Sequence, residues 1–413
     1  MIDMKKLREK YINLLLDKCI HPKNNSLFIT YDKGSSEFIN VLKKIAREKG
    51  YNNIITEEKD VFYEHELLKN LTASEIKVHP YFLNNTWDKA LESNCAFLMA
   101  SSPFPNYFED IEQSKIIAAN EATTKSRQKY MQSVMNDSIS WTIFGLPNKI
   151  WADKLFPNDA DSYEKLERLI YSFCMIDKDN PLDKWQKYIN IEHKKTDLLN
   201  SLNIKSLILK NDLGTNLTIG LVDNYIFRSL ENNHCIENIP TYSIWTSPHK
   251  YKADGIVYNS LPITYKNYNI EHCWFKFSDG KVIDYGAEKG KEYLDDFFSR
   301  GDSYKRLGEI AIIDFDSPIS KTQTIYNCNL FDENISTHLA LGCAYQNTTK
   351  NGSIMNEEEL DSVGCNVCPE HMDFTIGSRD FKIIAITADD KEIKIFENGN
   401  FNYRLINEES PFK

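Results

Sequence analysis

Glycine, proline and long apolar runs are scarce in this sequence, and each absence excludes a class of protein. Glycine and proline number only 16 and 13 among 413 residues, which argues against a collagen-like or disordered chain. No run approaches the ~18 apolar residues that a membrane span needs. The N-terminus, MIDMKKLREKYINLLLDK, lacks an apolar signal-peptide core and has the pattern of an amphipathic helix. We therefore expect a globular protein without a membrane partner.

The sequence also lacks a regular cysteine framework and an excess of basic residues. The nine cysteines are an odd number and are scattered through the chain, a pattern more typical of reduced cytoplasmic thiols than of a disulfide framework. The net charge is −11, and the sequence shows no basic stripe that could hold the phosphates of a nucleic acid. These features predict a cytoplasmic protein that does not bind nucleic acid.

What the chain does have is length and two contrasting patterns. At 413 residues it exceeds one compact core, so two domains are expected. In the first half, strand-like runs such as SLFITY (26–31) and CAFLMA (95–100) alternate with helical stretches such as 35–49 and 114–134. This alternation predicts an α/β domain with a parallel sheet over residues 1–185.

The pattern changes after Asp179-Asn-Pro. A polar helix over 182–202 is expected to bridge the two halves, and β signals dominate beyond it. The segments 272–285 (HCWFKFSDGKVIDY) and 381–396 (FKIIAITADDKEIKIF) each have the pattern of a hairpin. The second half, 186–413, is therefore predicted to be a β-rich α+β domain, and it contains every candidate catalytic residue.

Two segments near the C-terminus combine histidine with acidic residues. The candidates are Glu333, His338 and Tyr345 in LFDENISTHLALGCAY (330–345), and His371 and Asp373 in GCNVCPEHMDFTIGS (364–378). An H-x-D pair on a strand points both side chains to one face, where they can bind one cation. Histidine with carboxylate suits zinc, manganese or cobalt better than calcium. On its own the pair is a weak signal, because a solvated surface pair or a core histidine gives the same pattern.

These segments resemble the active-site motifs of the thermophilic aminopeptidase family, to which aminopeptidase T and aminopeptidase S belong. The similarity extends along nearly the whole chain. Besides the two C-terminal segments, it includes WTIFGLPNKIWADKLFP (141–157), DKDNPLDKW (177–185), LGTNLTIGL (213–221), NIPTYSIWTSP (238–248), AEKG (287–290) and RLGEIAI (306–312). Several motifs in order are more specific than any one of them, so the chain is identified as a member of this family.

The resemblance implies a metal-dependent aminopeptidase that releases N-terminal amino acids from peptides. It also implies two divalent cations (zinc, cobalt or manganese) in the C-terminal domain, and a homodimer whose N-terminal domains help to enclose the site. Carried over by position, the expected metal ligands are Glu309, Glu333, His338, Tyr345, His371 and Asp373. Glu333 is also the expected general base, and Tyr345 is expected to donate a hydrogen bond to the tetrahedral oxyanion.

One position departs from the family pattern. Where the family has N-x-P-x-x-E-V-F-T, this chain has Asn238-Ile-Pro-Thr-Tyr-Ser-Ile-Trp-Thr246, so Ser243 replaces a metal-ligand glutamate. A serine hydroxyl is short and neutral, so it cannot replace a carboxylate ligand. Three outcomes stay open. In the first, another carboxylate takes the place of the missing ligand. In the second, the site holds one ion, or a second ion only weakly, and still hydrolyses peptides. In the third, peptidase activity has been lost, and the protein either catalyses a non-peptidase reaction on an amino-acid derivative or is inactive.

Overall fold

The protein is divided into two compact units. The structure, a computed structural model, describes residues 3–135, 138–230, 235–265 and 268–412. Unit 1 comprises Met1–Trp185 and Glu231–Pro240, and unit 2 comprises Gln186–Leu230 and Thr241–Lys413. The sequence-based division at residue 185 does not include the return of Glu231–Pro240 to unit 1. Within the described ranges, no helix combines the length and apolar character that crossing a membrane requires.

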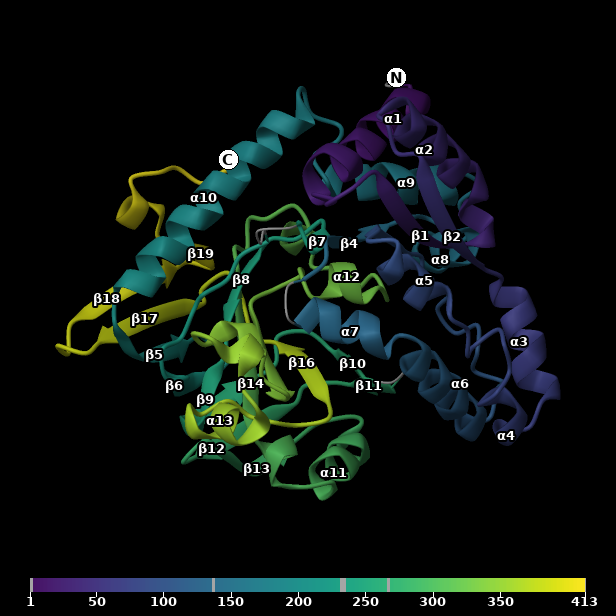
Figure 1. Ribbon diagram of the computed structural model, residues 1–413. Helices are drawn as coiled ribbons and strands as arrows, with labels where there is room; N and C mark the ends of the chain where they lie inside the picture. The colour runs from purple at the N-terminus through teal and green to yellow at the C-terminus, as the bar shows by residue number, and fades with distance from the viewer. Residues whose placement is uncertain (1–2, 136–137, 231–234, 266–267, 413) are drawn as a thin grey trace. The chain divides into compact units, whose positions relative to one another are not determined.

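Unit 1 is built on a parallel sheet with the strand order β2-β1-β3-β4-β7 (Figure 1). The strands are β1 (Ser26–Asp32), β2 (Asn53–Lys59), β3 (Ala96–Ser101), β4 (Trp141–Gly145) and β7 (Asn238–Ile239). Every residue of β1 except Asp32 is buried, as expected for a parallel strand with helices on both faces. The predicted parallel sheet is confirmed, whereas the addition of β7 from much later in the chain was not foreseen.

Helices pack on both faces of this sheet. The helices of unit 1 are α1 (Met4–Leu14), α2 (Ser36–Glu48), α3 (Val61–Asn70), α4 (Ala73–Ile76), α5 (Thr86–Glu92), α6 (Gln113–Ser126), α7 (Gln128–Met135), α8 (Lys149–Leu155) and α9 (Ser162–Phe173). Of these, α3, α4 and α6 pack against one another in an apolar cluster of their own that includes Leu68, Ile76 and Ala118. On one face Phe28 and Phe97, which are paired across β1 and β3, contact Trp87 of α5. On the other face Tyr11 of α1 contacts Phe144 of β4. Aromatic packing therefore fixes both helical layers to the sheet.

The helical stretch predicted over 114–134 is confirmed, and the structure divides it into α6 and α7. The break falls at Arg127, whose guanidinium group lies 4.4 Å from the centre of the Trp87 ring. The segment contains no glycine or proline that would signal a helix end. The break is accompanied by a tertiary contact and has no local sequence signal.

Unit 2 contains a large antiparallel sheet with the strand order β13-β12-β9-β6-β5-β17-β18-β19. The strands are β5 (Ile204–Lys210), β6 (Asn216–Leu221), β9 (Pro248–Tyr258), β12 (Trp274–Ser278), β13 (Lys281–Gly286), β17 (Lys382–Thr387), β18 (Glu392–Glu397) and β19 (Asn400–Phe401). Both predicted hairpins are confirmed, as β12–β13 and β17–β18. The predicted bridging helix is α10 (Pro181–Ser201).

A smaller antiparallel sheet of unit 2, in the order β16-β15-β14-β8, carries the candidate site. Its strands are β8 (Ser243–Thr246), β14 (Leu307–Ile313), β15 (His338–Gly342) and β16 (His371–Thr375). The other elements of unit 2 are β10 (Ile263–Tyr265), β11 (Tyr268–Ile270), α11 (Lys291–Ser299), α12 (Asn329–Asp332) and α13 (Glu357–Ser362). One apolar core joins the two sheets, with the rings of Phe275 and Phe374 4.9 Å apart. The predicted β-rich second domain is confirmed.

A buried ion-pair network ties three segments of unit 2 together. Lys195 of α10 pairs with Glu192 at 2.8 Å and with Asp314 at 2.9 Å, and all three side chains are buried. Asp314 directly follows β14 and also accepts a hydrogen bond from the Tyr403 hydroxyl at 2.6 Å. Burial alone would lower the pKa of Lys195, but the two carboxylates hold it well above its ordinary value. The network therefore fixes the end of the strand that carries Glu309.

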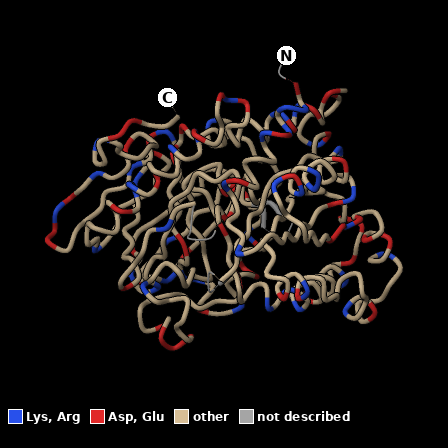
Figure 2. The backbone as a smooth tube through the Cα atoms, turned by 45° about the horizontal axis from the view of Figure 1, so that its top comes forward, with Lys and Arg blue, Asp and Glu red and all other residues tan. Residues whose placement is uncertain are grey.

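Charged residues of both signs are mixed along the chain. Figure 2 shows Lys and Arg positions interspersed with Asp and Glu positions, and no long uninterrupted basic stretch is visible among the residues drawn in colour.

Candidate metal centre

Three neighbouring strands of the smaller sheet bring carboxylates together. Every residue of β14 (LGEIAII) is buried, so Glu309 is an acidic side chain inside an apolar strand. Glu309 lies opposite Ala340 of β15, and Ala340 lies opposite Asp373 of β16. Directly paired residues project from the same face of a sheet. The small side chain of Ala340 therefore leaves space between the two carboxylates.

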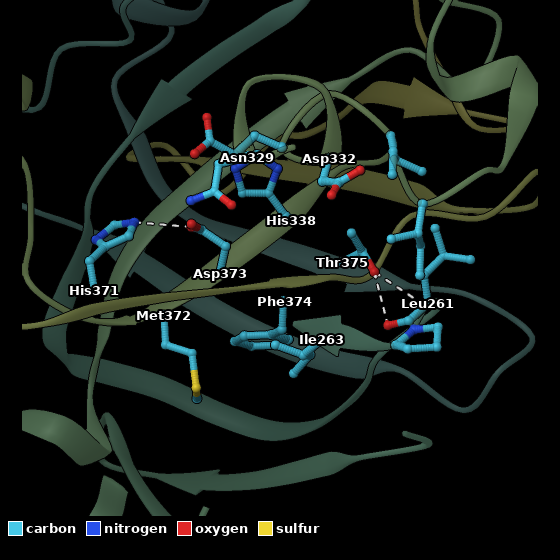
Figure 3. A pocket seen from close by; sticks show the side chains of 14 residues that line it. Leu261, Ile263, Asn329, Asp332, His338, His371, Met372, Asp373, Phe374 and Thr375 are labelled. Carbon is cyan, nitrogen blue, oxygen red and sulfur yellow. Dashed lines mark hydrogen bonds and ion pairs between the residues drawn. The ribbon is translucent and has the colours of Figure 1, made fainter. Parts of the chain in front are cut away.

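His338 completes this group. It pairs with Ala311, which is two residues from Glu309 on β14 and so projects from the same face. Glu309, His338 and Asp373 each place one ligand atom within 4.8 Å of the others. Figure 3 shows His338, Asp373 and His371 pointing into the same space. Nitrogen and carboxylate ligands of this kind suit zinc, manganese or cobalt.

Main-chain carbonyl groups orient both histidines. Nδ1 of His338 lies 3.1 Å from the carbonyl oxygen of Ser336, and Nδ1 of His371 lies 2.8 Å from that of Cys343. Because a carbonyl oxygen only accepts, Nδ1 is the donor in both rings. Nε2 of the neutral ring is then left to bind a cation, an arrangement typical of metal-ligating histidines.

The group carries an excess of negative charge. Nε2 of His371 lies 3.0 Å from both Oε2 of Glu309 and Oδ1 of Asp373. Although burial favours the neutral ring, these carboxylates raise the pKa of His371 well above its ordinary value. Burial, together with the negative charges of Asp373 and Glu309, raises the pKa of Glu333 to about 8. A divalent cation would compensate this charge, so the residues present fit a metal ion.

Glu333 and Tyr345 lie beside this group. Glu333 follows α12 and lines the same pocket as His338 and Asp373. The centre of the Tyr345 ring lies 5.2 Å from the centre of the His371 ring, and the Tyr345 side chain is partly exposed. The structure thus brings all six predicted site residues into one region of unit 2. The role of each as ligand or base stays a prediction.

Ser243 lies in the same sheet, farther along the face of Glu309. It is the first residue of β8 and pairs with Ile313, four residues after Glu309 on β14. Residues at even spacing on a strand share a face, so a glutamate at position 243 would project from the face that carries Glu309. The neighbouring Tyr242 is buried between two other aromatic rings, those of Tyr188 and Phe412.

The group opens into a pocket of about 410 Å³. Its polar lining residues include Asn329, Asp332, Glu333, His338, His371 and Asp373, and its apolar lining residues include Leu261, Pro262, Ile263, Ile325 and Ile335. Sequence reasoning did not identify Asn329 or the loop that contributes Leu261. Ala340 could have been identified from the strand alternation, whereas the orienting carbonyl groups have no sequence signal.

Comparison with known families agrees with this geometry. The family described as thermophilic metalloprotease (M29) matches residues 4–401, a span that contains every residue of the group. The chain belongs to the thermophilic metalloprotease family.

Members of the M29 family resemble this chain over almost its full length. Aminopeptidase 2 of Geobacillus stearothermophilus is 30% identical over 405 residues, which cover 96% of this chain and 98% of the relative. Aminopeptidase AmpS of Bacillus subtilis (strain 168) is 31% identical over 374 residues, or 89% of this chain and 91% of the relative. The structure of wild-type AmpT from Thermus thermophilus has a TM-score of 0.88 at 23% identity, covering 97% of this chain and 100% of that one.

These findings confirm three predictions from the sequence. The family is the one that the motifs indicated, and the two-part fold is that of the AmpT structure. The enzyme class is also confirmed, since M29 is a metalloprotease family and the relatives it contains are named aminopeptidases.

Proposed function

We propose that this M29 protein is a cytoplasmic aminopeptidase that releases N-terminal amino acids from short peptides with a divalent cation as cofactor. The observation that carries the proposal is the grouping of Glu309, His338 and Asp373 on one sheet face, beside a pocket that His338 and Asp373 line. The pocket volume of about 410 Å³ falls in the range of about 300–1,000 Å³ typical of small-molecule sites. That size favours a short peptide over a folded protein.

The residues of the site can each take a defined part in hydrolysis. When bound by Glu309, His338 and Asp373, a zinc, cobalt or manganese ion supplies a Lewis acid that acidifies water and polarises the scissile carbonyl. Glu333 accepts a proton from the attacking water and passes it to the leaving amine. The Tyr345 hydroxyl donates a hydrogen bond to the developing oxyanion. The acidic lining attracts the free α-ammonium group of the substrate.

The first experiment compares peptides with free and blocked N-termini. We expect X-Gly-Gly peptides to be cleaved after X and their N-acetylated forms to react at least about 30-fold more slowly, because a lost charge pair of about 2 kcal/mol corresponds to that factor. Release of X is measured by mass spectrometry. A chelator should abolish the release, and zinc, cobalt or manganese should restore it. Equal cleavage of acetylated peptides would contradict an aminopeptidase.

The second experiment concerns the number of ions. The family resemblance implies two, and the neutral side chain of Ser243 predicts that the second is held weakly. Elemental analysis after dialysis should therefore find more metal per chain in Ser243→Glu than in the wild type, with higher peptidase activity. Ser243→Gln is the matched control, because it adds the same bulk without the charge.

The outcomes of this comparison separate the possible effects of Ser243. Two ions per chain in the wild type would show that the site needs no carboxylate at position 243. Metal-loaded wild type that cleaves no peptide, together with an active Ser243→Glu variant, would identify a site that has lost its peptidase activity through this substitution.

We also propose that the protein forms a homodimer through unit 1, as the family resemblance implies, and that neither nucleic acid nor a membrane is a partner. The net charge of −11 disfavours binding to nucleic acid, which is itself negatively charged. Light scattering tests the dimer, which should have twice the mass of 48.0 kDa of one chain. A monomer at working concentration would contradict it.

A further inference from the structure

The strand β16 is an edge of the smaller sheet, and the pocket follows this edge. Among the described residues, β15 is the one strand that pairs with β16. All five residues of β16 line the pocket. Figure 3 shows His371 and Asp373 on one side of the strand, and Met372 and Phe374 on the other. A pocket that touches residues from both faces of a strand lies along the edge of that strand. It therefore borders the main chain of β16.

Hydrogen bonds at the two ends of the β15–β16 ladder show which main-chain groups point to this edge. In an antiparallel pair, residues that bond to the partner strand alternate with residues whose amide and carbonyl groups point away from it. The Cys343 amide donates to the Glu370 carbonyl oxygen at 2.7 Å, and the Ile376 amide donates to the Thr337 carbonyl oxygen at 2.8 Å. The even-numbered residues of this segment therefore bond to the β15 side, and the odd-numbered residues point their amide and carbonyl groups to the outer edge.

The outer edge is occupied at one end and open at the other. Its odd-numbered residues are His371, Asp373 and Thr375. At Thr375 the chain itself uses the edge, because the Ser260 amide donates to the Thr375 carbonyl oxygen at 2.8 Å and the Leu261 amide donates to its Oγ1 at 3.1 Å. In the part of the chain that the structure describes, no other segment bonds to the outer main-chain groups of His371 and Asp373.

The open part of the edge lies where a peptide substrate would have to pass. Amide and carbonyl groups left unpaired at a strand edge form a template for a second extended chain. Paired strands lie about 5 Å apart, so a chain paired with Asp373 would run directly beside the ligand group that Glu309, His338 and Asp373 form. The same residue thus offers a carboxylate to the cation and two main-chain groups to a peptide.

We propose that the outer edge of β16 binds the main chain of the peptide substrate, which joins the smaller sheet as a short additional strand. This inference rests on the proposed aminopeptidase function. The residues that follow the scissile bond lie along β16, and their amide and carbonyl groups bond to the carbonyl and amide groups of Asp373. Asp373 is therefore a positioning residue through its main chain. Since these groups belong to the backbone, the contact holds peptides of different sequence in one register.

Methylation of single substrate amides tests this pairing with the wild-type, metal-loaded enzyme. The substrates are Ala-Ala-Ala-Ala-Ala and two forms N-methylated at the third or at the fourth residue, so the first peptide bond is unchanged. Neighbouring amides of an extended chain point to opposite edges, so methylation of one of these two nitrogens, and not of the other, should lower kcat/KM at least about tenfold. The tolerated position is the matched control. An ester in place of the sensitive amide removes the donor without adding a methyl group, and it should also lower kcat/KM.

Release of the first alanine, measured by mass spectrometry, separates two kinds of negative result. Equal rates for all peptides, equal losses at both methylated positions, or an ester that is cleaved as fast as the unmodified peptide would overturn the strand pairing and leave the aminopeptidase function intact. Failure to release alanine from the unmodified peptide would overturn both.

Discussion

Replacing Glu333 with glutamine is expected to lower kcat for peptide hydrolysis by about 10²–10⁴-fold, which is the usual contribution of a general base. Glutamine keeps the size of the side chain but cannot accept the proton of the attacking water. Glu309, His338 and Asp373 are unchanged in this variant, so bound metal should be retained. Steady-state kinetics with a tripeptide, combined with elemental analysis of the same sample, measures both quantities.

A control variant and the metal content make this result specific to Glu333. Glu288→Gln is the matched control, because the side chain of Glu288 is 76% exposed and lies outside the pocket. Loss of metal in parallel with activity would show that Glu333 is chiefly a ligand, and unchanged kcat with metal retained would remove it from the mechanism.

Tyr345→Phe should lower kcat by about 10²–10³-fold, as loss of one oxyanion donor does, and normal turnover would refute that role.

Removing the Lys195 ammonium group should have the largest effect on stability. Lys195→Met keeps the length of the side chain but leaves the buried carboxylates of Glu192 and Asp314 without their cation. Breaking a buried ion pair in this way costs about 3–5 kcal/mol of unfolding free energy. Urea denaturation followed by circular dichroism should show a lower midpoint, from which the loss of unfolding free energy is calculated.

Lys205→Met is the control for this prediction. Lys205 pairs with Asp390 at 2.8 Å, but both side chains are largely exposed, at 61% and 73%. Surface pairs contribute little to stability, so this variant should unfold close to the wild-type midpoint. Equal effects of the two substitutions would mean that the buried network contributes no more than a surface pair.

Local patterns in the sequence were sufficient to predict the elements of this fold. The apolar runs and amphipathic helices of the first half indicated the parallel sheet, and the alternation in 272–285 and 381–396 indicated both hairpins. The H-x-D pair of His371 and Asp373 was correctly placed on a strand. These predictions succeeded because each depends on residues close together in the chain.

Long-range pairing was beyond local patterns. The pairing of β7 with β4, in which the Ile143 amide donates to the Glu237 carbonyl oxygen at 2.9 Å, joins residues far apart in sequence. The contact of Leu261 with Thr375 is of the same kind. The prediction that Glu309 lies beside the later segments came from the family resemblance, because a lone glutamate in an apolar strand does not indicate which residues it contacts.

The main-chain partners of the two histidines have a consequence for how the site can change during evolution. Every residue type carries a backbone carbonyl group, so mutations at positions 336 and 343 can replace the side chains without removing the acceptors of His338 and His371. The orientation of the two rings therefore depends on the backbone at positions 336 and 343 and places little constraint on which amino acid stands there. A carboxylate can therefore be replaced, as the family resemblance implies for Ser243, without a change in the orientation of His338 and His371.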